Sequence, residues 1–133
     1  MKKIVSVIMA VLMCMVCSVA VFAEARAVGS ATRTSTLTVS AGTATCYSRY
    51  FDSNGSTSKV VITQSLEKQG FFWTWSTYAG EWTKSTSGST ATLSNKVYNL
   101  KSGTYRVKTV FTVTGTNGVT ESITVYSSEK TIA

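Results

Sequence analysis

Short segments in which apolar and polar residues alternate follow one another through most of the chain. An alternation with a period of two is typical of a β-strand with one buried face. The segment 104–114 has the clearest pattern, because Tyr105, Val107, Phe111 and Val113 fall on one face. The segments that we predict to be strands are 35–40, 43–51, 59–68, 71–78, 89–97, 104–114 and 119–126.

Turn signals separate these segments. The Asn54-Gly55 pair predicts a hairpin between the second and third strands, and 115–118 predicts another between the last two. Gly80, Glu81 and Trp82 read as a loop after the aromatic segment 71–78. Beyond the N-terminal region no segment has a helical period. Seven short strands joined by turns predict an all-β fold, a seven-stranded antiparallel sandwich of two sheets.

The N-terminal residues have a different pattern. Lys2 and Lys3 precede a largely apolar run of 19 residues, 4–22, which ends at small residues. These features are typical of a secretory signal peptide, cleaved after Ala23 or after Ala25. The alternative is an uncleaved membrane anchor, since about 18 apolar residues can span a bilayer.

From this pattern we predict a secreted, extracellular protein, with association at the cell surface left open. The expected organisation is a signal helix at 1–23, a flexible leader at 24–32 and one sandwich domain at 33–133. No membrane span remains after cleavage.

Composition restricts the chemistry of the secreted chain. The sequence has no histidine, and Cys46 is the one cysteine left after cleavage, which excludes Ser-His-Asp and Cys-His catalysis, a histidine zinc site and an internal disulfide. On its alternating segment Cys46 is expected to be buried and inert, with a disulfide-linked dimer or a reactive thiol as alternatives. The acidic residues form no recognisable motif, and 52–56 lacks the spacing of a calcium loop. We predict no enzyme, cofactor or metal, and keep a carboxylate-dependent hydrolase as a third hypothesis.

The net charge is positive. The chain has 13 basic and 6 acidic residues, a formal charge of +7, and removal of Lys2 and Lys3 leaves +5. A basic exported protein is attracted to anionic polymers such as teichoic acids, phospholipid surfaces and acidic glycans. The charges form no run, so solubility alone also explains them. No nucleic-acid partner is expected.

The segment Leu100-Lys101-Ser102-Gly103-Thr104-Tyr105-Arg106-Val107 resembles the corner before strand F of immunoglobulin-like and fibronectin type III-like domains. The resemblance implies an immunoglobulin-like sandwich in which the Tyr105 hydroxyl binds back to that corner. Cys46 and Val107 would take the places of the two core cysteines as ordinary core residues. Trp73 or Trp75 would be the core tryptophan.

Most of the chain is also similar to small secreted immunoglobulin-like proteins of Gram-positive, clostridia-type bacteria. The similarity lies in 63–68, the tryptophan cluster, 103–108 and 121–128. It carries no assigned activity, so it implies fold and compartment only.

The aromatic residues near the centre of the chain exceed what one sheet face needs. Phe71, Trp73 and Trp75 share one face of the predicted strand, and Phe72 and Tyr78 share the other. The surplus either stacks on sugar rings or covers a sheet edge or an interface. The candidate binding residues are Trp82, Trp75, Tyr78, Arg106 and Lys108.

Two functions from different classes remain open. The first is a non-enzymatic module that binds an anionic cell-wall polymer, a glycan or a protein, with stacking on Trp82 or Trp75 and charge from Arg106 and Lys108. The second is a structural protein that forms a homo-oligomer through its surplus aromatic surface. The sequence leaves the ligand and the oligomeric state open.

Overall fold

Eight β-strands make up most of residues 27–133, the part of the chain that the computed structural model describes. The predicted signal peptide lies outside the described residues. The strands are β1 (Thr32–Ser40), β2 (Thr43–Phe51), β3 (Thr57–Gln69), β4 (Trp75–Ser87), β5 (Thr90–Val97), β6 (Gly103–Gly115), β7 (Thr120–Tyr126) and β8 (Lys130–Ile132). Within residues 27–133 no helix has the length and apolar character needed to cross a membrane.

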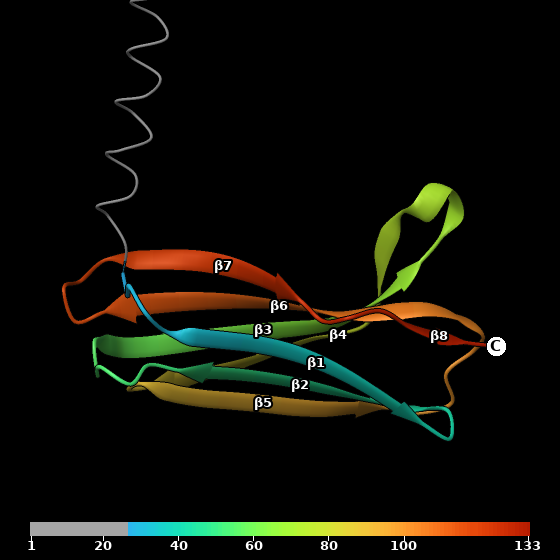
Figure 1. The fold of residues 1–133 in the computed structure, drawn as a ribbon, viewed down its shortest axis with the longest axis horizontal. Helices are drawn as coiled ribbons and strands as arrows, with labels where there is room; N and C mark the ends of the chain where they lie inside the picture. The colour runs from blue at the N-terminus through green and yellow to red at the C-terminus, as the bar shows by residue number, and fades with distance from the viewer. Residues whose placement is uncertain (1–26) are drawn as a thin grey trace, which may run out of the picture.

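The strands form two antiparallel sheets whose long axes run in a similar direction (Figure 1). The smaller sheet has the order β1-β2-β5, and the larger has the order β4-β3-β6-β7, with β8 also paired to β6. The predicted all-β, two-sheet antiparallel sandwich is therefore confirmed, with β8 as a short additional strand. The N-terminal end of β1 and the aromatic β3–β4 turn lie at opposite ends of the sandwich (Figure 1).

Alternation located most strands correctly. β2 has the predicted bounds, and β6 extends its predicted segment by one residue at each end. Tyr105, Val107, Phe111 and Val113 are fully buried, which confirms the predicted inner face of β6. The predicted hairpin between β6 and β7 is also present, with Gly115 N–H donating to the Val119 carbonyl at 2.9 Å.

The predicted hairpin between β2 and β3 is wrong, because these strands belong to different sheets. Residues 52–56 instead cross from one sheet to the other. The buried Asp52 carboxylate organises this crossover: it accepts hydrogen bonds from Asn54 N–H at 3.0 Å, Ser56 N–H at 2.7 Å and the Thr57 hydroxyl at 2.9 Å. The Asn54-Gly55 pair does form a turn, as predicted, but the hydrogen bonds to Asp52 hold that turn in a crossover between the two sheets.

Opposing effects act on the acidity of Asp52. Burial, the largest single influence, raises the pKa of the carboxyl, but the hydrogen bonds from Asn54, Thr57 and Ser56 together lower the pKa below its usual value. These bonds favour the ionised form, since an ionised carboxylate is the better acceptor. The crossover is therefore most stable with Asp52 charged.

The predicted strand at 71–78 and the predicted loop at 80–82 are both wrong. Residues Phe71–Trp73 form a short 3-10 turn, and β4 runs from Trp75 through Gly80, Glu81 and Trp82 to Ser87. The β3–β4 ladder has two register shifts, and the one opposite Gln64 and Ser65 coincides with positive φ angles of 98° at Gly80 and 55° at Glu81. Such bulges keep a strand paired while they change the face to which its side chains point.

The packed domain includes residues 27–32, part of the predicted flexible leader. Ala27 and Val28 are 4% exposed and belong to a hydrophobic cluster with Tyr50, Phe111 and other residues of both sheets. The described part of the leader therefore contributes to the core.

The interior consists of two apolar clusters. One contains Ala27, Val28, Tyr50, Val60, Ile62, Ala91, Phe111 and Val113. The other contains Leu37, Ala44, Cys46, Leu66, Tyr105 and Val107. Cys46 is fully buried, as predicted, and burial raises the pKa of its thiol to about 11. Cys46 and Val107 both belong to this second cluster.

A polar belt runs through the middle of the interior, and we define it as Ser35, Ser48, Gln64, Asn95 and Thr109. Thr109 shares hydrogen bonds with Ser48 at 2.8 Å and with Ser35 at 2.9 Å. Gln64 Nε2 donates to Ser48 Oγ at 2.7 Å, and Asn95 Nδ2 donates to Gln64 Oε1 at 2.9 Å. These bonds satisfy polar atoms whose burial would otherwise be costly.

The predicted tyrosine corner is present. The Tyr105 hydroxyl donates to the Lys101 carbonyl at 2.6 Å, and Tyr105 itself is fully buried. The bond ties the start of β6 to the connection that leaves β5.

Replacement of Tyr105 by Phe should lower the free energy of unfolding by about 1 kcal/mol, the usual net value of one hydrogen bond. Urea denaturation measures the change. Tyr98→Phe is the matched control, since Tyr98 is 64% exposed. Equal stabilities of wild type and Tyr105→Phe would contradict a contribution from the corner bond.

Replacement of Asp52 by Asn should destabilise the domain in a pH-dependent way. The folded-state pKa of Asp52 is lowered, so its ionised form adds stability above its unfolded pKa of about 3.9. That stability is lost as the pH falls through the folded-state pKa. The gap in unfolding free energy between wild type and Asp52→Asn should therefore narrow below about pH 4.

Chemical denaturation at a series of pH values tests the Asp52 prediction. Glu129→Gln is the control, because Glu129 is an exposed acid. A gap between wild type and Asp52→Asn that stays constant with pH would show that charge on Asp52 has no role.

Candidate functional site

The turn between β3 and β4 projects from the body of the sandwich (Figure 1). We call its side chains Phe71, Phe72 and Trp73 the aromatic tip. Gly70 N–H donates to the Thr74 carbonyl at 2.7 Å, and the Thr74 hydroxyl donates to the Phe71 carbonyl at 2.7 Å. These local bonds close the turn.

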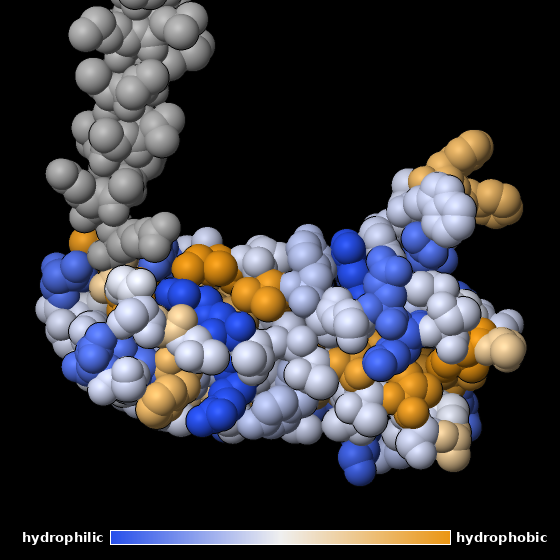
Figure 2. Space-filling view, in the orientation of Figure 1, coloured by the Kyte–Doolittle hydropathy of each residue, from blue (hydrophilic) through white to orange (hydrophobic). Residues whose placement is uncertain are grey.

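All three side chains of the aromatic tip are exposed. The exposed fractions are 89% for Phe71, 92% for Phe72 and 80% for Trp73. Apolar side chains project from the body at this point in Figure 2. Isolated exposed apolar residues are common, but a contiguous group often marks an interaction site. The tip therefore adds little to the core and offers a surface to a partner.

The backbone of the aromatic tip is strained. Phe72 has a φ of 56° and Trp73 a φ of 62°, both in the left-handed region that bulky side chains rarely adopt. Such conformations cost of the order of 1–3 kcal/mol each and often occur at functional sites. In this strained backbone conformation the rings remain exposed instead of packing into the core.

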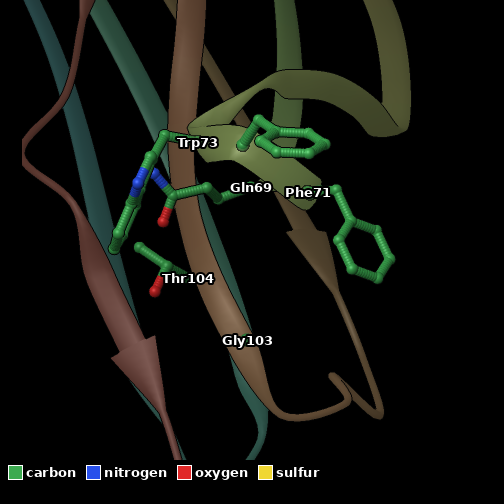
Figure 3. Close-up of a pocket in the computed structure, with 7 residues that line it drawn as sticks. Gln69, Phe71, Trp73, Gly103 and Thr104 are labelled. Carbon is green, nitrogen blue, oxygen red and sulfur yellow. The ribbon is translucent and has the colours of Figure 1, made fainter.

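A shallow hollow of about 510 Å³ lies at the base of the aromatic tip. Its lining includes Gln69, the three tip residues, Gly103 and Thr104. In Figure 3 Trp73 lies beside Gln69 and near Thr104, whereas the Phe71 ring points away from them. The rings thus share no single plane.

Trp75 and Arg106, both predicted binding residues, are brought together on the outer face of the larger sheet. The Arg106 guanidinium lies 4.1 Å from the Trp75 ring centroid and 4.0 Å from the Tyr126 ring centroid. Its Nε also donates to Glu67 Oε1 at 2.8 Å. Rings cover the guanidinium and Glu67 compensates its charge, which leaves Arg106 poorly suited to bind an anion.

Lys108, the second predicted basic binding residue, lies close to Arg106 on the same strand. Lys108 is half-buried opposite Tyr126, one step along the same face from Arg106. Lys59 pairs with Thr114 at the other end of β6. Lys59 therefore lies away from Arg106 and Lys108.

Tyr78 lies at the inner side of β4, away from the Arg106 stack. Its ring meets the Tyr105 ring edge-on, with centroids 5.3 Å apart, and its exposed fraction is 38%. Lys68 Nζ lies 5.6 Å from both ring centroids. Burial first, and then the neighbouring Tyr78, raise the pKa of Tyr105. Tyr78 thus mainly covers the tyrosine corner.

Trp82 packs against the apolar cluster that contains Cys46 and is not in an exposed loop. A Cβ atom at Gly80 would lie only 2.7 Å from the Trp82 ring, so the ring needs a glycine there. Neither Trp73 nor Trp75 is the core tryptophan that the resemblance implied. Trp82 is the tryptophan that packs against the core.

The sequence contained a signal for the aromatic tip that the strand prediction missed. Phe71 and Phe72 are adjacent, so in a strand they would point to opposite faces, and Gly70 precedes them. The predicted surplus of aromatic residues is real, but it lies in the turn. Of the predicted binding residues, none belongs to the aromatic tip.

A second hollow, of about 370 Å³, lies beside Arg33 and Glu121, between the edges of the two sheets. Arg33 Nη2 is 3.8 Å from Glu121 Oε1, and the guanidinium lies 5.6 Å from the Tyr50 ring centroid. This ion pair bridges β1 and β7.

Among residues 27–133, no group of three or more His, Cys, Asp or Glu side chains lies close enough together to hold a metal ion.

Comparison with known proteins identifies no group for this chain. The sequence matches no protein-family model, and a search of the curated proteins finds no match.

The packed Trp82 and the exposed Trp73 should differ in how much their replacement affects stability. Trp82→Ala should lower the free energy of unfolding by about 2–3 kcal/mol, because it opens a gap beside the core. Trp73→Ala should leave stability within about 0.5 kcal/mol, as for an ordinary surface change. Thermal and urea unfolding measure both. A stable Trp82→Ala domain would contradict the packing role.

Proposed function

We propose that this chain is an exported, non-enzymatic β-sandwich module that binds a component of the cell envelope through its aromatic tip. The N-terminal pattern supports export, and the positive charge supports an anionic envelope partner. The absence of histidine supports the non-enzymatic part of the proposal. One observation carries the binding role: three consecutive aromatic side chains are exposed on a strained turn.

The balance of energies supports binding over a structural role. Left in water, the rings give no burial energy, and the turn still costs strain. Each aromatic ring that a partner buries contributes roughly 1.5–3 kcal/mol. The Arg106 stack and the packed Trp82 lie below the tip and support β4. We therefore propose the aromatic tip as the binding site in place of the residues proposed from the sequence, which were Trp82, Trp75, Tyr78, Arg106 and Lys108.

A homo-oligomer is the second candidate, and the same exposed rings favour it. Two copies could bury their aromatic tips against each other. In that case the apparent size of the protein would rise with concentration, and loss of the tip rings would abolish the rise.

Envelope binding can be measured on protein recovered from the medium after expression of residues 1–133. Its mass should show loss of the first 23–25 residues, and it should co-sediment with isolated Gram-positive envelopes. The triple change Phe71→Ser, Phe72→Ser and Trp73→Ser should weaken this binding by about tenfold or more, equal to roughly 1.4 kcal/mol or more.

Phe51→Ser is the control, since Phe51 is a 39% exposed aromatic residue at the opposite end of the sandwich. It should keep wild-type binding. Equal retention of the wild type and the triple variant would refute the proposed site, and a mass that includes Met1 would refute cleavage. Loss of binding in the triple variant together with loss of concentration-dependent size would instead support the homo-oligomer.

A further inference from the structure

We propose that the aromatic tip inserts into the interfacial layer of an anionic phospholipid bilayer. This inference rests on the proposed function and names the partner of the same site. Four features support it: the directions of the rings, the composition of the tip, the hydrogen bonding of the turn and the charge of this end of the sandwich.

The directions of the rings suit a deformable partner. Phe71 and Trp73 diverge from the turn (Figure 3), and the positive φ angles of Phe72 and Trp73 maintain that divergence. A sugar ring stacks on one flat face, and a rigid protein would need a separate pocket for each ring. Lipid headgroups and upper acyl chains can instead rearrange around three separated rings.

The composition of the tip fits the boundary between headgroups and acyl chains. Tryptophan is enriched at membrane interfaces, where its apolar ring and its N–H group find suitable surroundings. Phe71 and Phe72 carry no polar group in their side chains, so they suit the deeper, apolar side. The tip thus presents both kinds of aromatic residue in consecutive positions.

The hydrogen-bonding needs of the turn's backbone limit how deeply the aromatic tip can insert into a bilayer. The Gly70 and Thr74 bonds close its base with N···O distances of 2.7 Å and 3.2 Å. The turn between them is short, and a backbone group without a partner is costly in hydrocarbon but can bind water at the interface. The geometry therefore favours shallow insertion.

Three lysines belong to the strand ends and the connection next to the base of the tip. Lys101 is exposed just before β6, and Lys130 is exposed at the start of β8, where it pairs with Tyr105. Lys68 lies next to Gln69 at the end of β3. Basic groups near a membrane surface are attracted to anionic headgroups. Glu67 is paired with Arg106 and opposes this attraction little, whereas the exposed Glu129 beside Lys130 offsets part of it.

Vesicle flotation tests the inference with two compositions, phosphatidylcholine alone and phosphatidylcholine mixed with phosphatidylglycerol. The mature wild-type domain should float with the mixed vesicles and much less with the neutral ones. The triple change Phe71→Ser, Phe72→Ser and Trp73→Ser should reduce flotation by about tenfold, and Phe51→Ser should not. Binding should weaken at 1 M salt, where the Debye length is about 3 Å.

Insertion itself has a separate readout. Tryptophan emission of the wild type should shift to shorter wavelength on the mixed vesicles, and brominated lipids should quench it. Trp73→Phe should lose most of the shift and the quenching while it keeps flotation, because Trp75 and Trp82 remain at the sandwich body. Unchanged shift and quenching in Trp73→Phe would overturn insertion of the tip.

Two further outcomes would overturn the lipid assignment and leave the proposed function standing. One is retention by lipid-free cell walls with no flotation, which identifies a wall polymer. The other is retention that a protease treatment of the envelopes abolishes, again with no flotation, which identifies a protein. Equal flotation of the wild type and the triple variant would overturn the role of the tip. Thermal unfolding of each variant checks that the sandwich remains folded.

Discussion

The polar belt in the middle of the interior determines how the two sheets lie on one another. An apolar interface tolerates small shifts, whereas the hydrogen bonds of Gln64 with Ser48 and Asn95 would be lost if the sheets shifted. Thr109 adds a connection from β6 to both Ser48 and Ser35. The belt thereby fixes β3 and β6, the two central strands of the larger sheet. β4 pairs with β3, and β7 and β8 pair with β6.

The aromatic tip depends on this anchored pair through β4. β4 pairs with β3 at 11 positions, and its inward Trp82 packs against the core below the turn. Trp82 faces inward while Trp75 faces outward onto Arg106, and the two bulges between them leave these opposite faces unchanged because each adds one residue. A firmly held base thus supports a short turn whose rings have no core to enter. The protein thus presents an ordered apolar surface while the packing of its core is undisturbed.

The basic side chains fall into two groups: those engaged in contacts within the sandwich and those free to contact a ligand. Arg106 and Arg33 are each paired with a carboxylate and a ring, so they stabilise the sandwich locally. Lys101 and Lys130 remain exposed near the aromatic tip. The net charge of the sequence therefore overstates what a ligand meets at Arg106, and the lysines of this end are the groups that support an anionic partner. A site of this kind relies on apolar burial, with electrostatics as a weaker, salt-dependent addition.

The sequence by itself determined the strands with simple alternation, the inner face of β6, the burial of Cys46 and the tyrosine corner. These features depend on local spacing: the Tyr105 hydroxyl binds a carbonyl only four residues earlier. Only the tertiary structure decided that Asn54-Gly55 leads across the sandwich, that Trp82 packs inward and that Phe71, Phe72 and Trp73 are exposed. Turn chemistry is the same in a hairpin and in a crossover, so it does not choose the partner strand. A bulge reverses the alternation without altering the residue types, and therefore the faces of residues 75–82 depend on the pairing of β4 with β3.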